Sequence, residues 1–285
     1  MAQAMLTIGL PLALGWMMFC VGITLSVADF KRVVDYPGKI AAGLAAQLIG
    51  LPLIAFTMVH VFALPDMLAV GLWILALAPG GASSNAISHL AGGDSALSIT
   101  MTAVSSLIIP FSLPLLLPVV LTDVSAAIPV KTAILQLVAV TLLPVTLGMA
   151  IRHVMNGEGF ARFSAFAASS ALWALFFTVA VTLAANTAVF SQLFSIASVM
   201  VLLLCLLGMG LGVAVAKLFS GDSKLSKTFA IEVGIQNAGT AIFVAIVQLQ
   251  QPELALTPLL YGVLMNIPAI ILILLNKRMG KSLTI

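Results

Sequence analysis

The sequence IEVGIQNAGT at residues 231–240 places a carboxylate, two amides and two glycines inside an apolar run. Glu232 is the one acidic side chain in the chain that lies well inside an apolar stretch. Burying an ionised carboxylate in hydrocarbon costs on the order of 3 kcal/mol or more, so such a group usually faces a cavity and binds an ion, a proton or a cationic side chain. We therefore interpret Glu232 as part of a binding site inside a membrane.

The composition around this segment predicts an integral membrane protein. Hydrophobic residues make up 62% of the chain and charged residues 7%, and the mean hydropathy is +1.22, which is outside the range of soluble domains. The apolar segments are about 20 residues or longer, as in membrane-spanning helices, whereas barrel strands would be near 10 residues with strict alternation. We expect an all-α protein with about nine transmembrane helices, at residues 5–28, 39–63, 67–91, 95–121, 129–152, 163–185, 190–218, 225–249 and 255–276.

The distribution of cations predicts how these helices are oriented. If the N-terminus is outside, eleven of the 12 Lys and Arg residues lie in cytoplasmic segments, and Lys131 alone lies outside. We therefore expect a multi-pass protein of the inner (plasma) membrane, with the N-terminus outside and the C-terminus cytoplasmic. The basic balance reflects this topology and predicts no nucleic-acid partner. The connections near 29–38, 153–162 and 219–224 are short and polar, so residues 1–285 are predicted to form one transmembrane unit.

A second break, APGGASSN at residues 78–85, interrupts the third predicted span. Two broken segments at corresponding places in two halves of a chain are typical of a transporter's binding site. The second to fourth and the seventh to ninth spans repeat one layout and enter the membrane from opposite sides. We therefore expect an inverted repeat in which the two broken helices cross near the midplane. Gly208 and Gly212 have the spacing that favours close helix packing.

Oxygen-bearing side chains gather around both breaks. Ser98 and Thr102 are four residues apart and share a helix face, as do Glu232 and Gln236. Hydroxyl, amide and carbonyl oxygens with one carboxylate suit an alkali cation, whereas zinc and copper prefer imidazole and thiolate. Sodium is therefore the ion that we expect. The alternative interpretation is that the hydroxyls bond to carbonyls of their own helices and the amides bridge helices.

These motifs resemble those of the bile acid:sodium symporter family, and the chain looks like a bacterial member. The resemblance rests on the breaks at 78–85 and 232–237 and on GITLS at 22–26 with Asp29 and Phe30, and it spans nearly the whole chain. It implies two sodium ions. The first sodium site would use the side chains of Ser84, Asn85, Ser98, Thr102 and Glu232. The second would use Gln47, Glu232, Gln236 and the backbone carbonyls of Val233 and Ile235.

The resemblance also implies a core that moves against a panel. The core would comprise residues 39–121 and 190–276, and the panel residues 5–28 and 129–185. Bacterial relatives commonly have ten spans, so this chain is expected to lack the first. Asn237 and Asn266 would contact the substrate, and Ala82 occupies a position where some relatives carry a hydroxyl that touches it.

Together these features predict a sodium-coupled symporter of organic anions that works by alternating access. Its substrate would be bile-acid-like or a small carboxylate such as pantoate or a keto acid. The half-helices that begin near Asn85 and Asn237 point their positive ends at the crossing, which favours an anionic group. A proton-coupled transporter of the same fold, with Glu232 as the titrating group, is the alternative.

Two other classes of protein fit the sequence less well. A metalloid efflux carrier is a weaker alternative, because the cysteine thiol that is usual in the broken helix of such carriers is absent between Ala78 and Asn85. No enzyme is predicted, because the chain has no HExxH motif, no GxSxG motif and no paired aspartates in adjacent spans, and hence no catalytic residue is assigned. The lipid bilayer is an expected partner, and the sequence predicts no oligomeric state.

Overall fold

The computed structural model describes residues 8–81, 83–121, 129–155, 157–185, 195–219 and 222–282. Within these ranges the secondary structure is helical, with one isolated antiparallel bridge between Gly80 and Gln236. Every apolar segment predicted to span the membrane contains helix. The helices of the first half are α2 (Leu10–Thr24), α3 (Val27–Asp35), α4 (Pro37–Ala45), η2 (Ala46–Gly50), α5 (Leu51–Val61), α6 (Asp66–Ala76), α7 (Ser84–Leu90) and α8 (Ser95–Val120). Those of the second half are α9 (Val130–Leu137), η3 (Val138–Leu142), α10 (Leu143–Val154), α11 (Glu158–Ala185), α13 (Ile196–Lys217), α14 (Ser223–Gly234), α15 (Ala238–Phe243), η4 (Val244–Gln248), η5 (Pro252–Ala255), α16 (Leu256–Leu264) and α17 (Asn266–Ser282).

Fewer helices than the predicted nine are continuous enough to cross a membrane alone. Five continuous stretches among the described residues have the length and apolarity of a span, and α2 with α3, bent by 68°, makes a sixth. Two of the other predicted spans are divided into shorter helices. The segment 67–91 consists of α6 and α7, and the segment 225–249 consists of α14, α15 and η4. The predicted breaks at 78–85 and 232–237 are therefore present, and they shorten the helices on either side.

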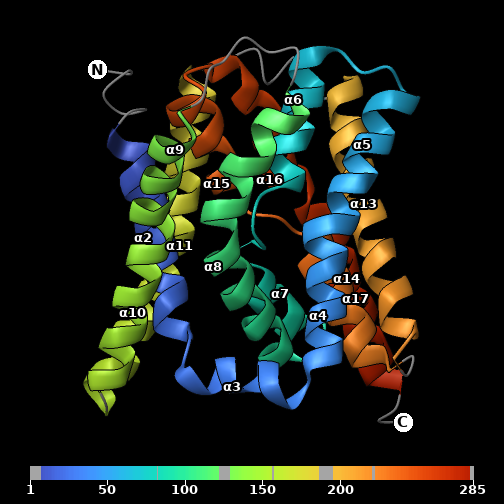
Figure 1. Ribbon diagram of the computed structural model, residues 1–285. Helices are drawn as coiled ribbons and strands as arrows, with labels where there is room; N and C mark the ends of the chain where they lie inside the picture. Colours follow the sequence, from blue (N-terminus) through green and yellow to red (C-terminus); the bar gives the residue numbers. More distant parts are fainter. Residues whose placement is uncertain are drawn as a thin grey trace.

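The segment 29–38, which the sequence predicted as a polar connection, is mostly the helix α3. The helix begins at a capping box, in which the Ser26 backbone N–H and hydroxyl each lie 2.7 Å from Asp29 Oδ2. Figure 1 shows α3 lying across one end of the bundle, between α2 and α4. Thr100 Oγ1 shares its hydrogen between the Ala96 carbonyl of its own helix at 2.8 Å and the Asp29 carbonyl at 3.1 Å, and the second contact joins α3 to α8.

The helices form two groups that α8 and α15 link, since α8 contacts both α9 and α14, and α15 contacts both α2 and α6. Figure 1 shows α2, α10 and α11 together at one side and α4, α5 and α13 at the other. Within the first group α2 and α10 approach through glycines. A Cβ atom at Gly22 would lie 2.2 Å from the Val145 carbonyl oxygen, and one at Gly148 would lie 2.4 Å from the Phe19 carbonyl oxygen. Only a residue without a side chain permits these backbones to touch.

The predicted close packing at Gly208 and Gly212 is confirmed, and it supports the broken helix α14. A Cβ atom at Gly212 would lie 2.2 Å from the Phe229 carbonyl oxygen, and one at Gly208 would lie 2.9 Å from the Val233 carbonyl oxygen. The backbone of α13 thus rests directly on the backbone of α14. Because Glu232 lies on α14, this contact fixes the height of the carboxylate in the bundle.

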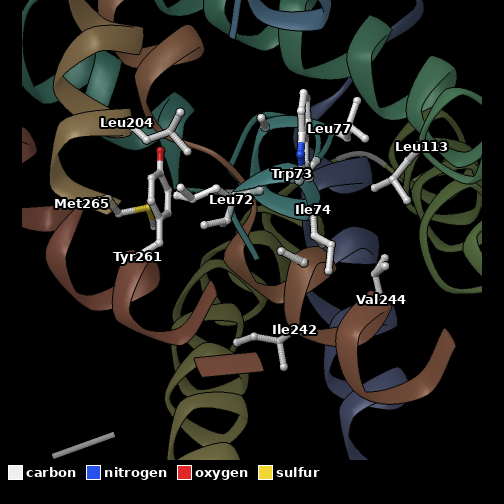
Figure 2. Packing of buried hydrophobic residues seen from close by; sticks show 14 of the residues in the cluster. Leu72, Trp73, Ile74, Leu77, Leu113, Leu204, Ile242, Val244, Tyr261 and Met265 are labelled. Carbon is white, nitrogen blue, oxygen red and sulfur yellow. The ribbon is translucent and has the colours of Figure 1, made fainter. Parts of the chain in front are cut away.

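The largest hydrophobic cluster surrounds the two breaks. It includes Trp73 and Ile74 of α6, Ile242 of α15 and Tyr261 of α16, all at most 6% exposed. Figure 2 shows these side chains around the region where α6, α15 and α16 meet, with Leu204 of α13 near the Tyr261 ring. The unwound backbone therefore lies inside a packed, apolar environment, where each of its polar groups needs a protein partner or a ligand.

Candidate functional site

The two broken segments cross each other and are paired through their backbones. Gly81 donates its N–H to the Ile235 carbonyl at 3.0 Å, and Asn237 donates its N–H to the Pro79 carbonyl at 2.8 Å. The chain directions are opposite, as in a two-residue antiparallel ladder. These bonds satisfy four backbone groups that unwinding would otherwise leave unpaired in the interior.

Glu232 lies beside this crossing, near the C-terminal end of α14. Its side chain is fully buried, at 0% exposed. Ser98 Oγ lies 2.5 Å from Glu232 Oε1, and Thr102 Oγ1 lies 2.9 Å from Glu232 Oε2. Ser98 and Thr102 occupy successive turns of α8, so the predicted shared face is the face that the carboxylate meets.

Asn85 and Ser84, at the start of α7, add further oxygens to the same cluster. Asn85 Oδ1 lies 2.9 Å from Ser98 Oγ and 3.1 Å from Thr102 Oγ1, and Ser84 Oγ lies 3.4 Å from Thr102 Oγ1. Each hydroxyl has a single hydrogen, so Ser98 and Thr102 cannot donate to the carboxylate and to the amide oxygen at once. The cluster therefore holds more acceptor oxygens than hydrogens to fill them, which is the donor set that a cation requires.

The carboxylate has no cationic side chain as a partner within the described part of the chain. The one ion pair found there joins Arg162 to Glu158 at 3.7 Å, and both of these side chains are exposed. A buried carboxylate without a counter-charge is strongly unfavourable unless an ion or a proton neutralises it. The environment of Glu232 therefore fits a group that binds one or the other.

The residues predicted for a second sodium site are also brought together. Gln47 Nε2 donates to Gln236 Oε1 at 3.3 Å, and Gln236 Nε2 donates to the Val233 carbonyl at 2.7 Å. Gln47 Oε1 is buried and has no hydrogen-bond partner among the described residues. The Ile235 carbonyl already accepts the Gly81 N–H and has its second lone pair left.

Two local features bring Gln47 and the first break to this place. Gln47 lies in η2, a π-helical turn that precedes Pro52; such turns are frequent at functional sites. Gly80 permits the break to approach, because a Cβ atom there would lie 3.1 Å from Glu232 Oε2 and 3.2 Å from Gln47 Nε2. A larger residue at position 80 would enter the space between the carboxylate and the amide.

The residues predicted to contact the substrate differ in burial and position. Asn237 is buried and caps α15, accepting the Thr240 N–H on its Oδ1 at 3.0 Å, while its Nδ2 meets only Met18 Sδ at 4.0 Å. Asn266 is exposed, and its amide donates to carbonyls of its own helix turn, at 2.8 Å to Gly262. Ala82 lies outside the described residues. The structure thus places Asn237 at the crossing, and it gives Asn266 no hydrogen bond to it.

Sequence reasoning missed two side chains at the crossing. Tyr261 of α16 is buried and donates its hydroxyl to the Gly234 carbonyl, which closes the C-terminal end of α14. Thr240 of α15 is fully buried, and its hydroxyl has no partner among the described residues. A tyrosine is unusual in this chain, which has only 2, and this was the one available signal for Tyr261.

Comparisons with known proteins agree with this geometry. A family model described as the Sodium Bile acid symporter family matches residues 11–193. A Bacillus subtilis protein, the "Uncharacterized sodium-dependent transporter YocS", is 33% identical over 226 residues, which cover 79% of this chain and 70% of that protein. The human "Sodium/bile acid cotransporter 4" is 30% identical over 282 residues, which cover 93% of this chain and 62% of that protein. The human "Hepatic sodium/bile acid cotransporter" is 28% identical over 249 residues, with coverages of 81% and 68%.

The matched residues include α2 and α3, the first break, and the Ser98 and Thr102 hydroxyls of α8. The longest of these alignments also spans the second break with Glu232, because it covers 93% of the chain. The chain therefore belongs to the sodium bile acid symporter family, whose members are membrane transporters and not enzymes.

Proposed function

We propose that this chain is a sodium-coupled symporter of an organic anion that works by alternating access. The observation that carries the proposal is the Glu232 carboxylate, which is 0% exposed, faces two hydroxyls and has no cationic partner among the described residues. The names of the relatives, which include "sodium-dependent transporter" and "sodium/bile acid cotransporter", favour sodium as the coupling ion.

The proposed mechanism uses two sodium ions. The first ion would lie among the oxygens of Ser84, Asn85, Ser98, Thr102 and Glu232, and the second among Gln47, Glu232, Gln236 and the carbonyls of Val233 and Ile235. Either ion would neutralise the negative charge of Glu232, which the hydrogen bonds from the hydroxyls compensate only in part. Since the ligands come from η2, α7, α8, α14 and the break that follows α14, bound ions would hold both broken helices in one arrangement.

The proposed substrate is an organic anion held near the start of α15. Helix α15 continues into η4 as one apolar helix, Ala238–Gln248, whose positive N-terminal end lies at the crossing, where a carboxylate or sulfonate is favoured. Asn237 Nδ2 is the donor best placed to contact the anion, since its present partner is a thioether sulfur at 4.0 Å. We propose Asn266 and Ala82 as further substrate contacts; the anion would be bile-acid-like or a small carboxylate such as pantoate or a keto acid.

The proposed architecture is an inverted repeat of nine spans, with the N-terminus outside and the C-terminus in the cytoplasm of a plasma membrane. The core would comprise residues 39–121 and 190–276, and the panel residues 5–28 and 129–185. Two observations favour this division. Contacts within the panel join α2 to α10 and α11, and contacts within the core join α13 to α14 and α16.

A thermal-shift screen of organic anions, with and without sodium, tests the proposed function. We expect sodium to raise the melting temperature in a saturable way, because a ligand at about 100 times its Kd stabilises the folded state by about 2.7 kcal/mol. An anion that is a substrate should stabilise further in sodium and not in choline, since its site needs the ions. A protein that responds equally to sodium and choline would contradict the proposal.

Cysteine labelling tests the proposed orientation. Single cysteines near Asp66 and Gln251 should react with an impermeant thiol reagent added outside cells, because both loops lie at the end of the bundle opposite α3. Cysteines near Arg162 and Ser223 should react only after the membrane is opened. The natural thiols, Cys20 and Cys205, are both buried and should contribute little background. The reverse labelling pattern would contradict the proposed orientation, in which the N-terminus lies outside.

A further inference from the structure

Three polar residues repeat the first proposed sodium site one helical turn away. Ser88 lies four residues after Ser84, Asp94 four before Ser98, and Thr228 four before Glu232. Residues four apart lie on the same helix face, about 6 Å along the axis. Helix α7 runs from the crossing toward the end that holds α3, whereas α8 and α14 begin near that end and run back. All three residues are therefore displaced from the first site toward the α3 end. We call Ser88, Asp94 and Thr228 the second polar layer.

Direct contacts hold this second polar layer together. The Asp94 N–H donates to Thr228 Oγ1 at 2.7 Å, which joins the turn before α8 to α14. The Gly93 N–H donates to the Ser88 carbonyl at 2.8 Å, which closes the same turn onto α7. Thr228 Oγ1 in turn donates to the Lys224 carbonyl at 2.9 Å. One lone pair of Thr228 Oγ1 is therefore still available.

Ser88 is the unexplained member of the layer. Its side chain is 0% exposed, and its hydroxyl has no hydrogen-bond partner among the described residues. A buried hydroxyl without a partner destabilises a fold, so each such group needs an explanation. A Cβ atom at Gly93 would lie 2.6 Å from Ser88 Oγ and 2.8 Å from Thr228 Oγ1, so both hydroxyls face the same side of the turn. Ser88 Oγ, which has no hydrogen-bond partner among the described residues, and Thr228 Oγ1, which has one lone pair left, thus lie close to the same point.

The charges around the layer favour a cation. Asp94 is exposed, and its Oδ1 accepts the N–H groups of Ala96 and Leu97 at 3.0 and 3.1 Å, so neither of these bonds uses the second carboxylate oxygen. Lys227 precedes Thr228, but its Nζ is directed at Asn276 Oδ1 of α17, at 2.8 Å. The Asp94 carboxylate therefore lies at the solvent-exposed edge of the layer.

We propose that Ser88, Asp94 and Thr228 form a transient sodium-binding layer, through which an ion passes between the Glu232 site and the solution at the α3 end of the protein. This proposal rests on the proposed sodium coupling. Asp94 attracts the ion, and the Ser88 and Thr228 hydroxyls replace part of its water shell one turn before the Glu232 site. Carboxylate and hydroxyl oxygens are the ligands that hard cations prefer. The turn at Gly93 must shift to admit the ion.

A layer on the path changes the rates of sodium binding without changing its equilibrium. In Ser88→Ala we expect the association and dissociation rates to fall together by about fivefold or more, as when a barrier loses one ligand. The dissociation constant should stay within about twofold of the wild-type value, because the final site is intact. The melting temperature without sodium should hold or rise, since an unpartnered hydroxyl has been removed. The measurement is stopped-flow tryptophan fluorescence of the purified protein with sodium chloride alone, beside the equilibrium thermal-shift titration.

Two further variants complete the experiment. Asp94→Asn keeps the Oδ1 that caps α8 and removes the charge, so it should slow association and dissociation together. Ser105→Ala is the matched control, because Ser105 is buried on α8 and donates to its own helix at Thr102 O, 3.1 Å away, and it should keep wild-type rates. Wild-type rates in both Ser88→Ala and Asp94→Asn would overturn the layer while leaving sodium binding intact. A changed dissociation constant with only one changed rate would assign Ser88 a structural role and overturn it too. A wild-type protein without any response to sodium would overturn the proposed function and the layer together.

Discussion

The Glu232→Gln protein is expected to stay folded and to lose nearly all of its stabilisation by sodium. Glutamine keeps the size of the side chain; its oxygen can accept from one of the Ser98 and Thr102 hydroxyls and its NH2 group can donate to the other, so both hydroxyls keep a partner. The substitution also removes the energetic cost of a buried carboxylate without a counter-charge, so stability in choline should hold or rise. Titration of sodium against the melting temperature measures the effect. Sodium-driven uptake of any identified anion should fall to background.

Glu253→Gln is the matched control for this experiment. Glu253 lies in η5 and is exposed, so the same change of charge there should leave the sodium response intact. Ser98→Ala removes one oxygen of the cluster and should give an intermediate result, with more sodium needed for half of the shift. Equal sodium-dependent shifts in wild type and Glu232→Gln would refute Glu232 as a ligand. A wild-type protein whose transport follows pH and not sodium would instead favour proton coupling at Glu232.

The second large effect is expected from Gly212→Ala, which should destabilise the fold around the site. The added Cβ atom would lie 2.2 Å from the Phe229 carbonyl oxygen, and neither backbone can give way without moving α13 or α14. Overpacking of this kind costs about 1–3 kcal/mol, and contact with backbone places the change at the upper end. We expect a clear fall in melting temperature and weaker stabilisation by sodium, because α14 carries Glu232.

Gly210→Ala separates this effect from the general consequences of changing a glycine. Gly210 lies two residues away on α13, and a Cβ atom there would meet nothing within 4 Å. Since alanine favours helix over glycine by about 0.8–1 kcal/mol, this variant should be as stable as the wild type or slightly more stable. Similar losses of stability in the two variants would contradict the packing argument.

The sequence allowed the helical fold and the polar cluster to be predicted because both depend on local patterns. Apolar runs specify spans directly, and the breaks at 78–85 and 232–237 carry proline, glycine and polar residues in a short window. Ser98 and Thr102 could be placed on one face from their spacing alone. That Asn85 meets the same two hydroxyls follows from the position of α7 against α8, and only the resemblance to the family had suggested it.

Other features depend on contacts that no local pattern encodes. The Tyr261 hydroxyl reaches Gly234, which is 27 residues away in the chain, and the Asp94 N–H reaches Thr228, 134 residues away. The helix α3 had a readable signal, the Ser26 and Asp29 capping box, but its charged residues made the segment resemble a loop. The exposure of Asn266 follows from how α17 packs, and so its expected place beside the substrate stays a proposal.

The helix α3 has a mechanical consequence for the proposed movement of core against panel. A flexible loop between α2 and α4 would allow the two parts to drift apart, whereas a helix of nine residues keeps a fixed length of about 13 Å. In the proposed movement α3 would therefore act as a rigid link between the two parts, with one pivot at 25–26 and the other at Tyr36. In the proposed movement, sliding of the core along the panel would require α3 to rotate and to shift against α8, to which Thr100 joins it. The length of α3 would then limit how far the two parts can separate at this end.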